Sequence, residues 1–271
     1  MSKRLRLGCI HDLNAQPLVA CLGEVCPDAH LVHDVPSALA RQLAHGQLDA
    51  ALIPVAEYLR ASRYHLIPGQ AIGCDGPAWS VKLISRRPLT TVGSVALDAG
   101  SRTSAALATR LLRRLSGTDP RVEDFPLSAA CEEITTDAVL LIGDRALVSR
   151  HATFLYSLDL GVAWKQWTGL PLVFAVWACH DRRTARDLAP RLEQSRRRSM
   201  AKLDEIASSA ADRLGIEPRR CHAYLSGVLR YELGAAQRAG MRSYRRLVLQ
   251  RDDHFVTRPH IRRRPIPTAT V

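Results

Sequence analysis

The residues best suited to chemistry form an anion-binding pattern at an expected helix start: residues 98–100 (Asp-Ala-Gly), then Ser101, Arg102, Thr103 and Ser104. The first turn of a helix leaves backbone N–H groups without partners and carries the positive end of the helix dipole. Hydroxyl and guanidinium donors there would strengthen the attraction for a carboxylate or phosphate. The same residues also suit a helix that Ser101 caps without any ligand. Their types alone leave both interpretations open.

Three further polar segments border expected strands. They are residues 11–14 (His-Asp-Leu-Asn), residues 76–80, which end in Ser80, and residues 140–144, which end in Gly143 and Asp144. Ligands of open α/β sheets bind beyond the carboxyl ends of the strands, where the connections diverge. We therefore expect all four segments to converge on one cleft.

Two carboxylates suggest catalysis but also fit simpler roles. Asp12 directly follows His11, and neighbours in sequence rarely face each other, so we interpret the pair as a surface turn. Glu57 follows an expected strand, and its charge suits the first turn of a helix. The sequence has no glycine-rich phosphate loop, dinucleotide fingerprint or Ser-His-Asp arrangement. It also has no His/Cys cluster with metal-ligand spacing, so we expect no metal ion.

Short strands alternate with helices over the first 180 residues. We expect strands at residues 5–10, 49–53, 79–85, 92–98, 138–142 and 172–179, and helices at 38–44 and 101–115. This alternation is typical of βαβ units around a largely parallel sheet. Breaks at residues 86–88 and 170–171 predict two crossings between lobes. The first lobe would hold residues 1–87 and 172–257, and the inserted second lobe residues 88–171.

The last third of the chain has a different pattern. Apolar residues recur at helical spacing after residue 181, so we expect helices throughout this region. Residues 258–271 contain three prolines and several basic side chains, and we interpret them as a frayed tail. The formal net charge is +12, and nearly all of the excess lies after residue 180. No nucleic-acid module or aromatic stacking motif accompanies it, so we expect no nucleic-acid partner.

The composition indicates a globular protein, because 46% of the 271 residues are hydrophobic and can form a sizeable core. Seven scattered cysteines without a Cys-x-x-Cys pair indicate reduced thiols that are buried as small hydrophobic groups. His11 and Asp12 interrupt the first apolar stretch too early for a secretory signal. The longest apolar run is about half the length of a membrane span. We expect a cytoplasmic protein; the sequence does not indicate its oligomeric state.

Nine short stretches carry a family resemblance, in a fixed order that covers the chain to about residue 250. They are residues 13–18 (LNAQPL), 35–40 (VPSALA), 46–58 (GQLDAALIPVAEY), 80–81 (SV), 101–104 (SRTS), 141–144 (LIGD), 159–161 (DLG), 167–171 (WTGLP) and 224–226 (YLS). Each stretch is weak by itself, whereas the ordered set is specific. Together they resemble the chorismate dehydratase family of menaquinone biosynthesis, in the futalosine pathway.

The resemblance implies a two-lobed α/β fold of the periplasmic-binding-protein type II kind, with mixed, largely parallel sheets and a helical C-terminal region. It implies a carbon–oxygen lyase that converts chorismate, a dianion, to 3-[(1-carboxyvinyl)oxy]benzoate by loss of water and without a cofactor. Asn14 matches the family's catalytic asparagine. Asp12 stands where the family commonly carries an aromatic residue. The substrate-binding residues would be Ser80, Ser101, Arg102, Thr103, Ser104, Gly143 and Asp144.

Aromatisation of the ring drives such a dehydration, so the enzyme must supply mainly orientation and modest acid–base help. A carboxamide is a poor base. We therefore expect Asn14 to hold the leaving hydroxyl, while water or the substrate's own carboxylate takes the ring proton. One alternative is the 1,4-dihydroxy-6-naphthoate synthase of the same pathway, which shares the fold but splits a larger substrate. The other is a non-enzymatic small-anion binding protein, which would carry an export signal.

Overall fold

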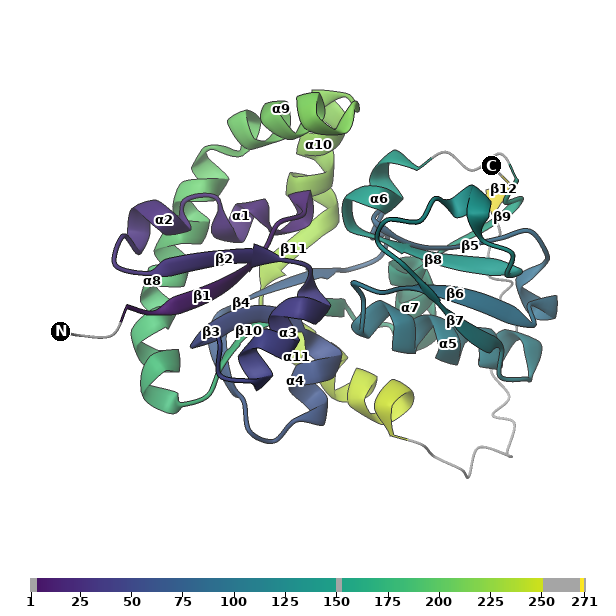
Figure 1. The fold of residues 1–271 in the computed structure, drawn as a ribbon, viewed down its shortest axis with the longest axis horizontal. Coiled ribbons are helices and arrows are strands. Elements are labelled where there is room, and N and C mark those ends of the chain that lie inside the picture. The colour runs from purple at the N-terminus through teal and green to yellow at the C-terminus, as the bar shows by residue number, and fades with distance from the viewer. Residues whose placement is uncertain (1–3, 150–152, 251–268, 271) are drawn as a thin grey trace.

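Two mixed β-sheets, each with its own helices, divide the molecule into two lobes (Figure 1). The computed structural model describes residues 4–149, 153–250 and 269–270. Each lobe combines strands with covering helices, which confirms the predicted two-lobed α/β architecture. The strands and helices predicted before residue 180 are all present, with ends that differ by a few residues.

The first sheet contains, in spatial order, β11 (Leu229–Glu232), β4 (His65–Cys74), β10 (Leu172–Cys179), β3 (Ala50–Pro54), β1 (Arg6–Ile10) and β2 (His30–Asp34). Its core lies on both faces, which explains the continuous apolar sequence of β10. Ala175 and Trp177 belong to the core shared with α1 (Gln16–Val19), α2 (Leu22–Val25) and α8 (Arg182–Ala201). Val173 and Val176 belong to the core shared with α4 (Val55–Arg60) and α11 (Ala235–Tyr244). Helix α3 (Pro36–Ala44) packs along β3.

The second sheet contains β12 (Ala269–Thr270), β9 (Tyr156–Asp159), β5 (Val81–Ser85), β8 (Ala138–Ile142), β6 (Ser94–Asp98) and β7 (Arg121–Phe125). Helices α5 (Thr103–Ser116), α6 (Gly143–Val148) and α7 (Leu160–Thr168) pack against it. Three one-turn 3-10 helices, η1 (Leu13–Ala15), η2 (Leu89–Thr91) and η3 (Cys131–Glu133), lie in the described connections.

The sheets are mixed, as expected, but less parallel than the alternating pattern indicated. Strand β1 runs parallel to β2 and β3, and β6 runs parallel to β7 and β8. The other described pairings are antiparallel, including those of β4 with β10 and of β5 with β8. Strands β4 and β10 carry the chain out of the first lobe and back into it, so they run in opposite directions. Sequence alternation predicts crossover helices but not the direction of a returning strand.

The prediction that the first crossing lies at residues 86–88 is wrong. Strand β5 already belongs to the second sheet, so the chain crosses through residues 75–80. It returns between α7 and β10 through residues 169–171. The second lobe therefore begins before β5, and residues 81–87 belong to it rather than to the first lobe.

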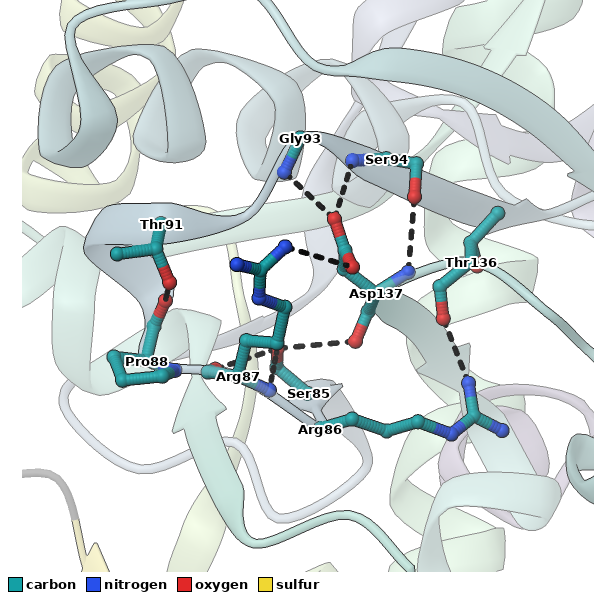
Figure 2. Close-up of polar contacts among 9 residues, drawn as sticks. All are labelled: Ser85, Arg86, Arg87, Pro88, Thr91, Gly93, Ser94, Thr136 and Asp137. Atoms are coloured by element: carbon teal, nitrogen blue, oxygen red, sulfur yellow. Dashed lines mark hydrogen bonds and ion pairs between the residues drawn. The ribbon is translucent and has the colours of Figure 1, made fainter.

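The Arg-Arg-Pro break is a turn within the second lobe, held by the residues that precede β8 (Figure 2). The Asp137 carboxylate accepts hydrogen bonds from the backbone N–H groups of Gly93 (2.8 Å) and Ser94 (3.1 Å) and forms an ion pair with Arg87. The Arg86 guanidinium donates to the backbone carbonyl of Thr136 at 2.7 Å. A turn signal of this kind marks a change of direction, and it does not reveal whether the chain leaves the lobe.

The C-terminal third is mostly helical, with α8, α9 (Leu203–Leu214) and α10 (Pro218–Ala223) on the first lobe. A π-helical turn, η4 (Tyr224–Val228), and strand β11 interrupt the helices, so the prediction of helix throughout is wrong there. In β11 buried Leu229 and Tyr231 alternate with exposed neighbours, a period of two that the preceding helical spacing obscured. The predicted tail lies outside the described residues except for β12, which pairs with β9.

Helix α11 and the π-helical turn η5 (Arg245–Leu249) connect the two lobes along one side of the molecule (Figure 1). The buried Tyr244 hydroxyl donates to the backbone carbonyl of Thr103 at the start of α5, at 2.7 Å. The Arg110 guanidinium of the same helix donates to the Leu247 carbonyl at 3.0 Å. Residues of α11 and η5 therefore fix α5 relative to the first lobe.

All seven cysteines are buried and free, which confirms the prediction of structural thiols. Among the described residues, no helix is long and apolar enough to cross a membrane.

A candidate active site between the two lobes

Residues from both lobes line a cleft that holds about 510 Å³ of space, part of it open to solvent. Seven of the eight predicted site residues line it: Asn14, Ser80, Ser101, Arg102, Thr103, Ser104 and Gly143. The apolar part of the lining includes Ile10, Ile72 and Phe174. The four polar segments converge here, as the sequence predicted, but Asp144 is not part of the lining.

Asn14 lies in η1, the short turn that follows β1. Its carboxamide oxygen is buried and has no hydrogen-bond partner among the described residues. A buried polar atom without a partner costs free energy unless a ligand or water satisfies it. Because Asn14 also lines the cleft, its carboxamide is placed to bond a ligand there.

Asp144 connects the lobes instead of contacting the cleft. Its carboxylate accepts a hydrogen bond from the Leu13 backbone N–H at 2.9 Å and pairs with Arg213 of α9 at 3.0 Å. It therefore fixes the peptide directly before Asn14. The prediction that Asp144 binds the substrate did not anticipate these contacts, because sequence order does not show which way the first residues of α6 point.

Asp12 is the cleft residue that sequence reasoning missed. Its side chain is 16% exposed and lies 3.2 Å from the His11 ring nitrogen, so the two neighbours do face each other. Burial, and then the negative charge of Asp144, raise the pKa of the Asp12 carboxyl to about 6. The carboxylate lies against Gly143, where a β-carbon would overlap with it. Gly143 also has φ +58°, which favours glycine.

The start of α5 keeps its anion-binding character in the folded protein. Asp98, whose side chain is 1% exposed, accepts from the Gly100 backbone N–H at 2.9 Å and pairs with Arg145. The Ser101 hydroxyl accepts from the Ser104 backbone N–H at 3.1 Å, so Ser101 does cap the helix. Arg102 is exposed beside the cleft, and its guanidinium has no partner among the described residues. The two sequence interpretations are therefore compatible: Ser101 caps the helix and Arg102 stays free for an anion.

Thr103 uses its hydroxyl to join the lobes. The oxygen accepts from the Ala56 backbone N–H at 3.2 Å, and the hydroxyl donates to the Phe174 carbonyl at 2.9 Å. The residue is 3% exposed. Thr103 therefore lines the cleft, while its hydroxyl is already bonded within the protein. Its role in substrate binding stays a prediction.

We predict that Thr103→Val lowers the free energy of unfolding by about 1–3 kcal/mol, because two buried backbone groups lose their partner. Urea unfolding followed by circular dichroism would measure this change. Thr109→Val is the matched control on the same helix, since the Thr109 hydroxyl bonds, among the described residues, only to the Ala105 carbonyl one turn earlier. Equal stability of wild type and Thr103→Val would contradict the proposed connection.

Ser80 lies at the crossing between the lobes and is 1% exposed. Its hydroxyl oxygen accepts from the Tyr224 hydroxyl at 2.6 Å, and burial raises the pKa of that tyrosine far above its ordinary value. Trp79 stacks on the same tyrosine, with ring centroids 6.5 Å apart. Its φ of +60° is strained for a bulky residue, and Asp159 holds it there by accepting from the Trp79 backbone N–H at 2.8 Å.

A second hollow adjoins the cleft and shares Arg102 with it. Its other charged lining residues are Arg41, Arg60, Arg63 and Glu57. Glu57 lies in the first turn of α4, as predicted, and pairs with Arg60 at 3.5 Å. The described lining of this hollow therefore holds four arginines and one carboxylate. Among the described residues, no group of three His, Cys, Asp or Glu side chains is placed to hold a metal ion.

The comparisons with known proteins agree with this geometry. The family model for menaquinone biosynthesis matches residues 5–250. The chain belongs to this menaquinone biosynthesis family. A relative in Thermus thermophilus, described as a chorismate dehydratase, is 32% identical over 234 residues, which cover 79% of this chain and 84% of that protein.

Solved structures similar to this member of the menaquinone biosynthesis family show the fold alone. A protein from Archaeoglobus fulgidus has a TM-score of 0.74 at 14% identity, with coverage of 90% of this chain and 96% of that one. A Candida albicans protein described as having the generic periplasmic binding protein fold has a TM-score of 0.58 at 9% identity, with coverage of 91% and 90%. The predicted periplasmic-binding-protein fold is thereby confirmed.

Proposed function

We propose that this chain is a chorismate dehydratase, which removes water from chorismate to give 3-[(1-carboxyvinyl)oxy]benzoate. The observation that carries the proposal is that one cleft holds both the Arg102 guanidinium and the buried Asn14 carboxamide oxygen, neither of which has a partner among the described residues. The 32% identical relative described as a chorismate dehydratase supports the same reaction.

The cleft is suited to a substrate with two carboxylates. One carboxylate would bind at the start of α5, where backbone N–H groups, the Ser104 hydroxyl and Arg102 surround an anion. Ile72, Phe174 and Leu229 supply apolar contacts for the ring. Ser80, whose hydroxyl oxygen already accepts from Tyr224, can donate its own proton to the ligand.

The reaction needs orientation more than strong catalysis, since aromatisation of the ring provides the driving force. We propose that Asn14 holds the leaving hydroxyl through its carboxamide and that the substrate's own carboxylate, or a water molecule, takes the ring proton. The fixed Leu13 peptide keeps Asn14 in position, because Asp144 holds it from the second lobe. No cofactor enters this scheme. As a biosynthetic enzyme, the protein would work in the cytoplasm.

Incubation of the purified protein with chorismate tests the proposal directly. A chorismate dehydratase forms an aromatic product that is lighter by one water, seen by ultraviolet absorbance and mass spectrometry. A small-anion binding protein would bind chorismate and release it unchanged, and a naphthoate synthase would leave it unchanged as well. Either of these results would refute the proposed function.

The arginines of the second hollow should speed capture of the dianion without taking part in chemistry. We predict that Arg41→Gln with Arg63→Gln lowers kcat/KM up to about tenfold at low salt and leaves kcat unchanged. The difference should shrink at high salt, where exposed charges are screened. Stopped-flow or steady-state rates at two ionic strengths would measure it. Arg183→Gln with Arg186→Gln on α8 removes the same charge from highly exposed positions outside the hollow. An equal loss in that control would exclude local steering.

A further inference from the structure

Among the described residues that line the cleft, only Asp12 carries a carboxyl group. It lies directly before η1, two residues from Asn14. The Leu13 peptide between them is fixed by the hydrogen bond to Asp144 at 2.9 Å. Asp12 and Asn14 therefore belong to one fixed turn, and both line the same cleft.

Charged groups of both signs surround Asp12. Asp144 at the start of α6 and Asp98 at the end of β6 disfavour its charged form, whereas His11 on the same turn and Arg213 of α9 favour it. Both neighbouring carboxylates are paired, Asp144 with Arg213 and Asp98 with Arg145. Burial adds the largest effect and acts in the same direction as the two carboxylates.

A dianionic substrate would bring two more negative charges into the cleft beside Asp12. Both would stabilise the protonated carboxyl further, because like charges disfavour ionisation. The Asp12 carboxyl of the substrate-bound enzyme would then hold a proton near neutral pH. Hydroxide is a poor leaving group, and the Asn14 carboxamide can orient it but cannot protonate it.

We propose that Asp12 is the general acid that protonates the departing hydroxyl. This inference rests on the proposed function and adds to it the proton source that Asn14 cannot supply. The combination of a protonated carboxyl and a nearby hydrogen-bonding group is a known way for one site to supply acid chemistry at neutral pH.

The step balances as follows. The O–H bond of the Asp12 carboxyl breaks, its proton joins the hydroxyl oxygen, and the ring C–O bond breaks to release water. The electron pair of the neighbouring ring C–H bond forms the new ring double bond, and that proton passes to the substrate's carboxylate or to water. Asp12 then regains a proton from solvent. Substrate gives product and one water, and the enzyme is unchanged.

The pH profile of the wild type has a definite sign under this proposal. A general acid works only while it is protonated. We therefore expect kcat/KM to fall as the pH rises through about 6, the pKa of the Asp12 carboxyl in the enzyme without substrate. The fall in kcat should come at higher pH, since bound dianion raises that pKa. His11→Ala should move the fall in kcat/KM to higher pH, because His11 lowers the pKa of Asp12.

Asp12→Asn is the decisive variant, since it keeps the shape and removes the proton. We expect kcat to fall by about 100-fold or more, the usual scale for loss of a general acid. The affinity of Asp12→Asn for the benzoate product, measured by calorimetry, should equal or exceed that of wild type, because the variant cannot carry the negative charge of an ionised Asp12. The fall of kcat/KM with pH should disappear. The matched control is Asp204 on α9, whose side chain is 95% exposed. The variant Asp204→Asn should behave as wild type.

Each other outcome has a separate meaning. Wild-type kcat in Asp12→Asn would overturn the acid assignment, and a profile that rises with pH would make Asp12 a base and overturn it too. A slow variant that keeps the wild-type pH profile would show that Asp12 only positions Asn14. A wild type that makes no aromatic product would refute the proposed function itself, which the Asp12 variants alone could not do.

Discussion

Asn14→Asp should give a folded protein that turns over chorismate at least about 100-fold more slowly, the scale for loss of one positioned donor at developing charge. The change is nearly isosteric, but it replaces the donor N–H₂ group by an acceptor that usually carries a charge. The new carboxylate would lie two residues from Asp12 in the same cleft, where it would repel the dianionic substrate. Steady-state kinetics at saturating chorismate would measure the loss of kcat.

Asn14→Ala separates the two effects of the aspartate variant. It removes the hydrogen bond without adding a charge, so activity should fall while substrate affinity falls less than in Asn14→Asp. Gln47→Glu makes the same chemical change on an exposed residue and should retain wild-type rates. Equal kcat for wild type and Asn14→Asp would contradict the role of Asn14 and the position of this turn beside the reacting carbon.

Arg102→Ala should weaken substrate binding by about 10- to 100-fold, because a charge-assisted bond to a carboxylate contributes about 1.5–3 kcal/mol. The free enzyme should remain as stable as wild type, since the Arg102 guanidinium has no partner among the described residues. Calorimetry with the product, together with KM for chorismate, would measure the loss of affinity.

Arg113→Ala is the matched control for Arg102. Arg113 lies near the opposite end of α5, is 54% exposed and pairs with Asp119. Its loss removes the same charge from the same helix but not from the cleft. Unchanged affinity in Arg102→Ala, or an equal loss in both variants, would exclude a carboxylate site at the start of α5.

The sequence by itself determined the architecture and most of the cleft. Strand and helix signals are local, so the apolar run of β10 and the capped start of α5 could be predicted from nearby residues. The same is true of the polar segments at strand ends, because parallel strands place those ends together. Asn14 came from the family resemblance, and it lines the cleft.

Strand β4 shows a limit of local signals within the fold. Its sequence contains Pro68-Gly69, which normally indicates a turn, and Gly69 has φ +97°. The strand nevertheless continues through this point in the middle of the first sheet, with a shift of register against β10. Pairing with β10 and β11 on both sides stabilises the irregular strand.

Only the tertiary structure decided the roles of the carboxylates. Asp144 was predicted to line the site, but it holds the Leu13 peptide across the lobes. Asp12 was interpreted as part of a surface turn, but it is mostly buried beside Gly143. Whether a carboxylate is buried, and which charges surround it, depends on contacts between residues more than 100 positions apart. Those contacts determine its pKa, and no local pattern in the sequence records them.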